Sequence, residues 1–182
     1  MKQLFQKSNT WRVLAFFFEN PYSEVYLRDL SRRLKANAST VLRVLKILES
    51  EGLVSRRVER NAVFFKAVQS GSFKALKTAF TLSKFARVVP LFLEKSRGLA
   101  CVLLYGSAAK GEDGPSSDYD VLCVAADCGV TGAELGGLLG RETNLRKFTM
   151  REWAEAGRTN RAFYLSVLSD SIALYGEKPV ID

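Results

Sequence analysis

Residues 103–111 read Leu-Leu-Tyr-Gly-Ser-Ala-Ala-Lys-Gly, and residues 118–124 read Asp-Tyr-Asp-Val-Leu-Cys-Val. Apolar runs before Gly106 and after Asp120 predict two buried strands bounded by turns. Side chains two positions apart on a strand point to the same face, so Asp118 and Asp120 are expected to project together while Tyr119 projects the other way. Two carboxylates on one face predict an oxygen-rich site for a hard divalent cation such as Mg²⁺.

Gly106 and Ser107 predict an anion-binding turn beside that metal site. Gly106 allows the chain to turn tightly out of its strand. A short helix beginning near Ser107 would direct unpaired backbone N–H groups at a bound phosphate. The alternative interpretation is a glycine turn followed by a solvated, Asp-rich hairpin that binds nothing.

The Gly-Ser pair, the spacer of ten residues and the Asp-x-Asp motif together resemble the signature of the polymerase-beta-type nucleotidyltransferase superfamily in its minimal single-domain form. A Ser also stands in the usual place before the first Asp. The resemblance implies an NTP as ligand and Mg²⁺ or Mn²⁺ as cofactor, with Asp118 and Asp120 as the metal-binding and catalytic residues. The predicted nucleotide-binding residues are Gly106, Ser107, Lys110 and Ser117.

Beyond the Asp pair the sequence keeps the alternation of helices and strands typical of an α/β domain. Residues 149–152 read Thr-Met-Arg-Glu, which is a capping box that predicts the start of a helix. The other predicted elements are a helix over residues 131–140, a strand over 143–148, a helix over 161–170 and a strand over 172–175.

The sequence departs from the superfamily at the third carboxylate that active members usually carry on a neighbouring strand. The strand available is residues 142–148, and the corresponding position is Asn144. An Asn coordinates metal only through a neutral carbonyl oxygen and accepts no proton at neutral pH. Glu142 is two positions from Asn144 and would share its face of the strand, but it lies nearer the strand end and is expected to be solvated. The chain contains no His, so the most common general base is absent.

Charge divides the chain into two parts. The net charge is +8, but residues 1–97 hold 19 Lys and Arg against 7 Asp and Glu, whereas residues 98–182 hold 8 against 12. A basic half joined to an acidic half indicates a polyanion-binding module beside a domain with another task. A generally basic, solvated surface would not place nearly all of the excess on one side.

The basic half predicts three helices and a pair of strands. Apolar residues recur at helical spacing, and Asn37 is placed to cap the third helix. A turn is expected at residues 59–61, where an Asn tolerates positive φ. The predicted elements are helices over residues 9–18, 27–34 and 38–51 and strands over residues 53–57 and 63–68.

Three helices followed by a basic hairpin resemble a winged helix-turn-helix domain of the kind found in bacterial and archaeal transcription regulators. The resemblance implies that the third helix enters the major groove of double-stranded DNA and that the hairpin lies along the backbone. Arg43 is the best candidate for reading a base, because Arg pairs bidentately with guanine, whereas the hairpin cations are phosphate candidates. Alternatively, these charges only solvate a small helical domain, or the domain contacts a protein. The predicted DNA-binding residues are Ser39, Thr40, Arg43, Lys46, Arg56, Arg57, Arg60 and Lys66.

Residues 71–97 predict a linker helix followed by an apolar run that a Pro interrupts. The run is far too short to cross a bilayer, so no membrane partner is expected. The apolar stripe of the helix could pair with a second chain, and a homodimer is favoured because palindromic operators need dimers. Cys101, Cys123 and Cys128 lack a metal-binding spacing, and no signal peptide is evident, which together predict the reducing cytoplasm.

The sequence therefore predicts an α+β protein with two domains. Residues 1–70 form a winged helix-turn-helix domain, residues 71–97 a linker helix, and residues 98–182 a small mixed-sheet nucleotidyltransferase-like α/β domain. Two functions stay open. In the first, a DNA-binding regulator carries a second domain that binds Mg²⁺-nucleotide or serves as a sensing or interaction module. In the alternative, an active enzyme moves NMP from an NTP to a hydroxyl acceptor.

Overall fold

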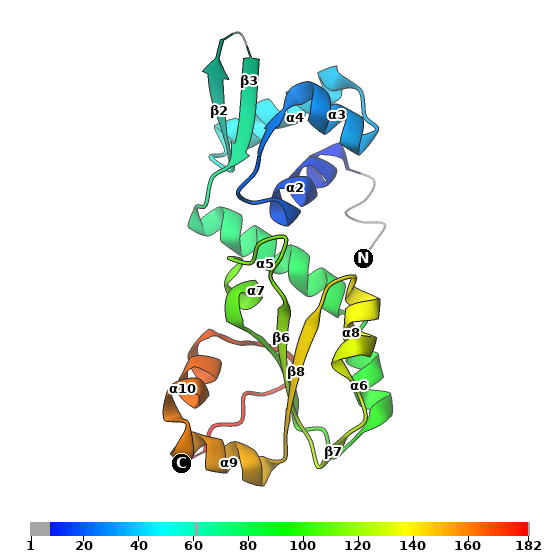
Figure 1. Cartoon of the computed structure of the whole chain (residues 1–182), viewed down its shortest axis with the longest axis vertical. Helices are drawn as coiled ribbons and strands as arrows, with labels where there is room; N and C mark the ends of the chain where they lie inside the picture. The colour runs from blue at the N-terminus through cyan, green and yellow to red at the C-terminus, as the bar shows by residue number, and fades with distance from the viewer. Residues whose placement is uncertain (1–7, 61, 182) are drawn as a thin grey trace. The chain divides into compact units, whose positions relative to one another are not determined.

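The computed structural model describes residues 8–60 and 62–181, and the chain forms two compact units that divide between Phe80 and Thr81 (Figure 1). The division falls inside one helix, α5 (Gly71–Phe85), which lies in the segment predicted as a linker. Separate clusters of buried apolar side chains form the cores of the two units.

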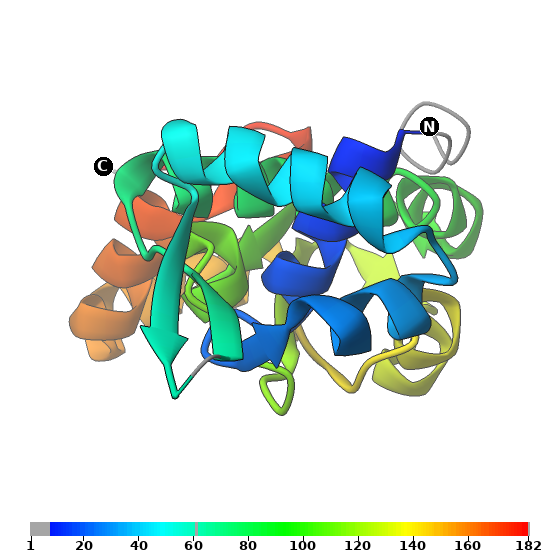
Figure 2. The same cartoon turned by 90° about the horizontal axis from the view of Figure 1, so that it is seen from above.

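The N-terminal unit packs helices on one small sheet. Its three strands are antiparallel in the order β1-β3-β2. Figure 2 shows α2, α3 and α4 packed together with the β2–β3 hairpin beside them. The three helices and the hairpin agree with the sequence prediction, whereas β1 was not predicted. The elements are α2 (Asn9–Glu19), β1 (Glu24–Tyr26), α3 (Leu27–Leu34), α4 (Ala38–Ser50), β2 (Val54–Glu59) and β3 (Ala62–Ala67), followed by the start of α5.

Local sequence explains where the helices of this unit begin and end. The Asn37 side chain accepts a hydrogen bond from the Ser39 N–H at 2.9 Å, as predicted for the cap of α4. Lys35 ends α3 in the left-handed region, with φ 48°. At the hairpin tip it is Arg60 that has positive φ, 45°, while Asn61 lies outside the described residues. Fully buried core side chains include Phe17, Leu30, Leu45 and Phe65.

The C-terminal unit is built on a four-stranded mixed sheet in the order β8-β6-β5-β9. Strands β6 and β8 are parallel, whereas β5 is antiparallel to both β6 and β9. Two further strands, β4 and β7, form a separate antiparallel pair. The elements are α6 (Val89–Lys95), β4 (Ser96–Arg97), β5 (Cys101–Tyr105), α7 (Gly106–Lys110), β6 (Tyr119–Val124), β7 (Asp127–Cys128), α8 (Gly132–Leu139), β8 (Thr143–Phe148), α9 (Met150–Thr159), α10 (Arg161–Asp170) and β9 (Ile172–Gly176).

Strands β5 and β6 are the inner strands of this sheet, which explains their uninterrupted apolar sequences. Helices α6 and α8 cover one face, and α9 and α10 cover the other (Figure 1). Leu103 and Leu122 pack on the second face against Trp153 of α9. Trp153 is fully buried, and its indole N–H donates to the Pro179 carbonyl at 2.7 Å, which ties the end of the chain to this face.

The sequence predicted most elements of this unit. Strand β8 spans the predicted residues 143–148, and the predicted capping box opens α9, where the Thr149 N–H donates to the Glu152 carboxylate at 2.7 Å. The two units together confirm the predicted α+β class with small sheets. Within the described residues, no helix has both the length and the apolar character needed to span a bilayer. Cys101 and Cys123 are buried free thiols, and Cys128 is a partly exposed one.

Candidate functional site

The two predicted carboxylates meet at one end of the inner strand β6. Asp120 lies between Tyr105 of β5 and Asn144 of β8 in the sheet register, and Asp118 directly precedes the strand. The Asn144 Nδ2 group donates to Asp118 Oδ2 and to Asp120 Oδ1, each at 3.4 Å. The structure therefore brings together both Asp side chains and the residue at the expected third-carboxylate position.

The side-chain amide of Asn144 lies between the negatively charged carboxylates of Asp118 and Asp120 and donates to both. The bonds are long, because N–H···O hydrogen bonds usually measure about 2.9–3.0 Å. An amide has a donor on one side and an acceptor on the other, so a rotated Asn144 side chain would offer its carbonyl oxygen to a metal held by the two Asp. The donor set, two carboxylates and one amide oxygen, fits a hard divalent cation.

The protein offers that cation only a partial set of anionic ligands. Within the part of the chain that the structure describes, no three His, Cys, Asp or Glu side chains are grouped so that they could hold a metal ion. Mg²⁺ usually completes its shell with waters and substrate phosphates when a protein supplies one or two carboxylates. A metal at this site would therefore need further oxygen ligands from waters or from a bound ligand.

Gly106 lies so close to the Asp120 carboxylate that any side chain on it would displace that carboxylate. Its φ is +73°, and a Cβ atom placed on it would lie 2.5 Å from Asp120 Oδ2. The residue thus meets two demands for glycine at once, a left-handed backbone and a close approach. Gly106 opens the five-residue helix α7, so the start of this helix lies directly against the Asp120 carboxylate.

A buried ion pair anchors the loop that leads to Asp118. Arg141 Nη1 lies 2.6 Å from Asp113 Oδ2, and the two side chains are 15% and 3% exposed. The Arg141 guanidinium also lies 4.6 Å from the centre of the Tyr119 ring. Because Arg141 comes just before β8 and Asp113 lies in the loop before β6, the pair fastens that loop to the strand that carries Asn144.

Two of the predicted nucleotide-binding side chains have partners within the protein. Lys110 Nζ lies 2.6 Å from Asp170 Oδ2 at the end of α10, and the hydrogen bond between them raises the pKa of Lys110. Ser117 Oγ accepts from the Gly114 N–H at 2.9 Å and closes the loop before Asp118. Ser107, at the second position of α7, is half-buried.

Arg146 is a residue of this site that sequence reasoning missed. It follows Asn144 by two positions on β8, so both side chains share the sheet face on which Asp120 lies. Its guanidinium carbon lies 4.8 Å from the centre of the Phe163 ring. Burial raises the pKa of the Tyr105 hydroxyl, and the charges of Arg146 and Asp120 act on it with opposite signs. The alternation along β8 was the signal that could have identified Arg146.

Glu142 lies outside the carboxylate cluster. It precedes β8 and is exposed, and its backbone carbonyl accepts from the Tyr119 N–H at 3.0 Å. Its side chain makes no hydrogen bond or ion pair with any residue from 8 to 60 or from 62 to 181. This placement agrees with the expectation that Glu142 is solvated.

The predicted DNA-binding side chains lie on α4 and on the β2–β3 hairpin. Ser39, Arg43 and Lys46 are exposed on α4, and Thr40 is half-buried. Arg56, Arg57, Arg60 and Lys66 are exposed on the hairpin. The surface of α4 also exposes Ile47, which the sequence analysis did not single out.

The hairpin cations do not form one cluster. Arg57 pairs with Glu59 and, at 2.8 Å, with Glu24, and its guanidinium lies 4.7 Å from the centre of the Phe64 ring. The hydrogen bond to Glu24 is the main cause of a raised pKa at Arg57. The side chain of Arg56 points to the opposite face of the sheet, because alternate residues of a strand face opposite ways. Arg57 is thus tied into its own sheet, whereas no residue of the described chain forms an ion pair with Arg56 or Arg60.

Comparisons with known proteins give only distant structural matches. No protein-family model matches the sequence, and no curated protein matches it. A toxin–antitoxin structure with AMP-PNP matches with a TM-score of 0.41 and 19% identity over 51% of this chain and 73% of its own.

Two further structures match at a similar level. A Methanosarcina mazei protein provisionally described as a transcriptional regulator gives a TM-score of 0.34 and 19% identity over 51% of this chain and 82% of its own. A Sulfolobus solfataricus protein provisionally described as a nucleotidyltransferase gives a TM-score of 0.36 and 15% identity over 62% of this chain and 95% of its own. At these identities and TM-scores the matches assign no function to this chain.

Proposed function

We propose that the chain is a DNA-binding protein of the transcription-regulator type. Its C-terminal unit binds a Mg²⁺-nucleotide and transfers the NMP group of that nucleotide barely or not at all. The observation that carries the proposal is the bridge from the Asn144 amide to Asp118 and Asp120. It supports a nucleotidyltransferase-type site in which the metal-binding pair is kept and the third carboxylate is replaced.

The residues present have distinct tasks in such a site. Asp118 and Asp120 would hold the metal, and the backbone at Gly106 and Ser107 would face the phosphates. Bound Mg²⁺ would neutralise phosphate charge and orient the phosphates. Arg146 would add a fixed positive charge beside the phosphates, since guanidinium groups pair well with phosphate oxygens.

Asn144 weakens the case for efficient transfer. A carboxylate at this position could accept the proton of an attacking hydroxyl, whereas an amide cannot. General-base help is worth on the order of 10² to 10⁴ in rate. The neutral amide also gives the metal less charge to bind, so we expect weak Mg²⁺-nucleotide binding and little or no transfer.

The N-terminal unit is proposed to bind double-stranded DNA as a winged helix-turn-helix domain. Three helices, the exposed Arg43 and Lys46 on α4, and a basic hairpin support this proposal. Helix α4 would enter the major groove and Arg60, at the hairpin tip, would contact phosphate. Arg57 is the weakest of the predicted contacts because two carboxylates already pair with it. A homodimer on a two-fold operator stays a prediction.

A second candidate function is an active nucleotidyltransferase that moves NMP from an NTP to a hydroxyl acceptor. The observation that favours it is the close approach of Gly106 to Asp120, which holds the metal-binding pair against the turn that faces the phosphates. In that case the N-terminal unit would deliver the enzyme to its acceptor.

Two measurements on the full chain decide between these functions. Calorimetric titration with a non-hydrolysable ATP analogue, with and without Mg²⁺, measures binding. Incubation with α-labelled NTPs and Mg²⁺ or Mn²⁺ measures transfer to protein and to small acceptors. We expect weak, Mg²⁺-dependent binding that Asp118→Asn abolishes, and little label.

Matched variants sharpen the result. Arg146→Ala should weaken nucleotide binding, whereas Lys147→Ala, which removes a neighbouring cation whose Nζ donates to the Cys128 carbonyl, should not. Robust labelling by the natural chain that disappears in Asp118→Asn would favour the enzyme, and Glu142→Gln would then test the nearest remaining carboxylate. Absence of any nucleotide binding would contradict both functions.

A further inference from the structure

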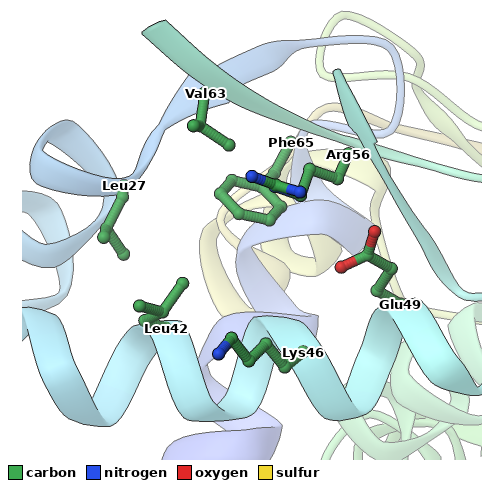
Figure 3. A pocket seen from close by; sticks show the side chains of 7 residues that line it. All are labelled: Leu27, Leu42, Lys46, Glu49, Arg56, Val63 and Phe65. Atoms are coloured by element: carbon green, nitrogen blue, oxygen red, sulfur yellow. The ribbon is translucent and has the colours of Figure 1, made fainter. Parts of the chain in front are cut away.

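A pocket separates helix α4 from the β2–β3 hairpin in the N-terminal unit. Its volume is about 430 Å³, which falls within the range of about 300–1,000 Å³ common for small-molecule sites. Figure 3 shows the hairpin residues facing the residues of α4 across it. Its lining residues are Leu27, Leu42, Lys46, Glu49, Arg56, Val63 and Phe65.

The floor and walls of this pocket are apolar. Phe65 is 1% exposed and belongs to the core, while Leu27, Leu42 and Val63 are half-buried and pack against that core. Half-buried apolar side chains therefore face an open space that a ligand could fill, and its burial of their surface would be favourable.

The rim of the same pocket carries charge of both signs, with one positive charge in excess. Lys46 and Glu49 come from α4, and Arg56 comes from β2. Across residues 8–60 and 62–181, none of the three forms an ion pair within 4.0 Å. Both cations thus keep their donors available to a ligand, and the excess of one charge matches a monoanion.

We propose that this pocket binds a small amphiphilic monoanion. A flat or branched apolar body would rest on the half-buried side chains of Leu27, Leu42 and Val63, and one carboxylate or sulfonate group would lie between Lys46 and Arg56. A DNA phosphate is a poorer occupant, because it has no apolar surface to cover the floor.

Occupancy of this pocket has a consequence that rests on the proposed DNA binding. Lys46 and Arg56 are two of the predicted DNA contacts, so an anion held by both removes them from the phosphate backbone. Each neutralised phosphate contributes to affinity and to its salt dependence. The ligand and the DNA then compete, and the pocket acts as an effector site for the DNA-binding unit.

The test uses anilinonaphthalene sulfonate, an aromatic monoanion whose fluorescence rises in apolar sites, and its neutral analogue phenylnaphthylamine, with the full chain. We expect one sulfonate probe per chain. Lys46→Ala and Arg56→Ala should each lower its affinity about tenfold, because each removes a charge-assisted contact. Glu49→Gln should raise the affinity. Arg28→Ala is the control, since it removes an exposed cation of α3 that does not line the pocket.

Three results would overturn the proposal: equal losses in Arg28→Ala and Arg56→Ala, equal affinities for the charged and the neutral probe, or displacement of the probe by inorganic phosphate alone. The last result would leave only a phosphate contact. Competition with a DNA duplex is measured separately by fluorescence anisotropy. If the chain binds the probe but not DNA, the proposed DNA binding fails and the pocket stands; if DNA binds and the probe does not, the reverse holds.

Discussion

Replacing Asn144 with Asp should lower the stability of the metal-free protein and make that stability depend on Mg²⁺. The change removes the donor of two hydrogen bonds of 3.4 Å and places a third negative charge between Asp118 and Asp120. Bonds of this length belong at the weak end of the range of about 0.5–1.5 kcal/mol, so their loss costs about 1 kcal/mol together.

Charge repulsion adds to that loss. Like charges about 4 Å apart repel by about 1 kcal/mol per pair in water and by about 4 kcal/mol at the effective dielectric of a protein surface. Asp118 and Asp120 are half-buried but Asn144 is exposed to water, so the lower figure applies; two pairs then bring the total to about 3 kcal/mol. For a unit of roughly 100 residues this loss corresponds to a fall in Tm of about 12 °C.

The assay is thermal unfolding of the full chain with and without Mg²⁺. Mg²⁺ should restore more of the Tm in Asn144→Asp than it adds to the natural protein, because only the folded state holds the carboxylates together. Asn144→Ala is the control, because it loses the hydrogen bonds without gaining a charge. Its Tm should fall by about a third as much as the Tm of metal-free Asn144→Asp. An Asn144→Asp protein as stable as the natural one, or indifferent to Mg²⁺, would refute the geometry that we describe for this site.

Three further outcomes are expected. Gly106→Ala should cost about 1–2 kcal/mol for its positive φ and displace Asp120, so calorimetry should show lost Mg²⁺-nucleotide binding; unchanged binding would contradict the close approach. In gel-shift titrations against salt, Arg60→Ala should weaken DNA binding for all sequences and Arg43→Ala should relax sequence preference, and affinity that ignores salt would argue against a DNA partner. The ion pair with Lys95 and the hydrogen bonds of the helix cap lower the pKa of Glu134 to about 2. The stability that ionised Glu134 adds to the folded protein is therefore complete above about pH 4.5 and is lost as the pH falls towards 2. Unfolding curves should show that Glu134→Gln loses less stability in acid than the natural protein, and identical curves would count against the ion pair.

The fold was predictable where local sequence decides structure. Apolar runs bounded by turns predicted β5 and β6, and side-chain caps predicted the starts of α4 and α9. Strand β1 has only three residues, and it forms because β3, some forty positions away, supplies its hydrogen bonds. The order β8-β6-β5-β9 also depends on pairing between distant segments, which no local pattern states.

The candidate site was predictable to the extent that strand parity and register decide it. Asp118 and Asp120 are two positions apart on a strand, which puts their side chains on the same face. The parallel neighbouring strand then places Asn144 beside them. Contacts between distant positions were not predictable, such as Arg141 with Asp113 or Lys110 with its partner on α10. These pairs depend on how loops and helices close over the sheet, which the local sequence does not specify.

The buried indole of Trp153 has a practical consequence. The chain has two tryptophans, and the other, Trp11, lies in α2 of the N-terminal unit. The tryptophan fluorescence of a Trp11→Phe protein would therefore come from the C-terminal unit alone, and that of a Trp153→Phe protein from the N-terminal unit alone. With these two variants the melting of each unit, and the response of each to nucleotide or to DNA, becomes a separate optical signal from one intact molecule.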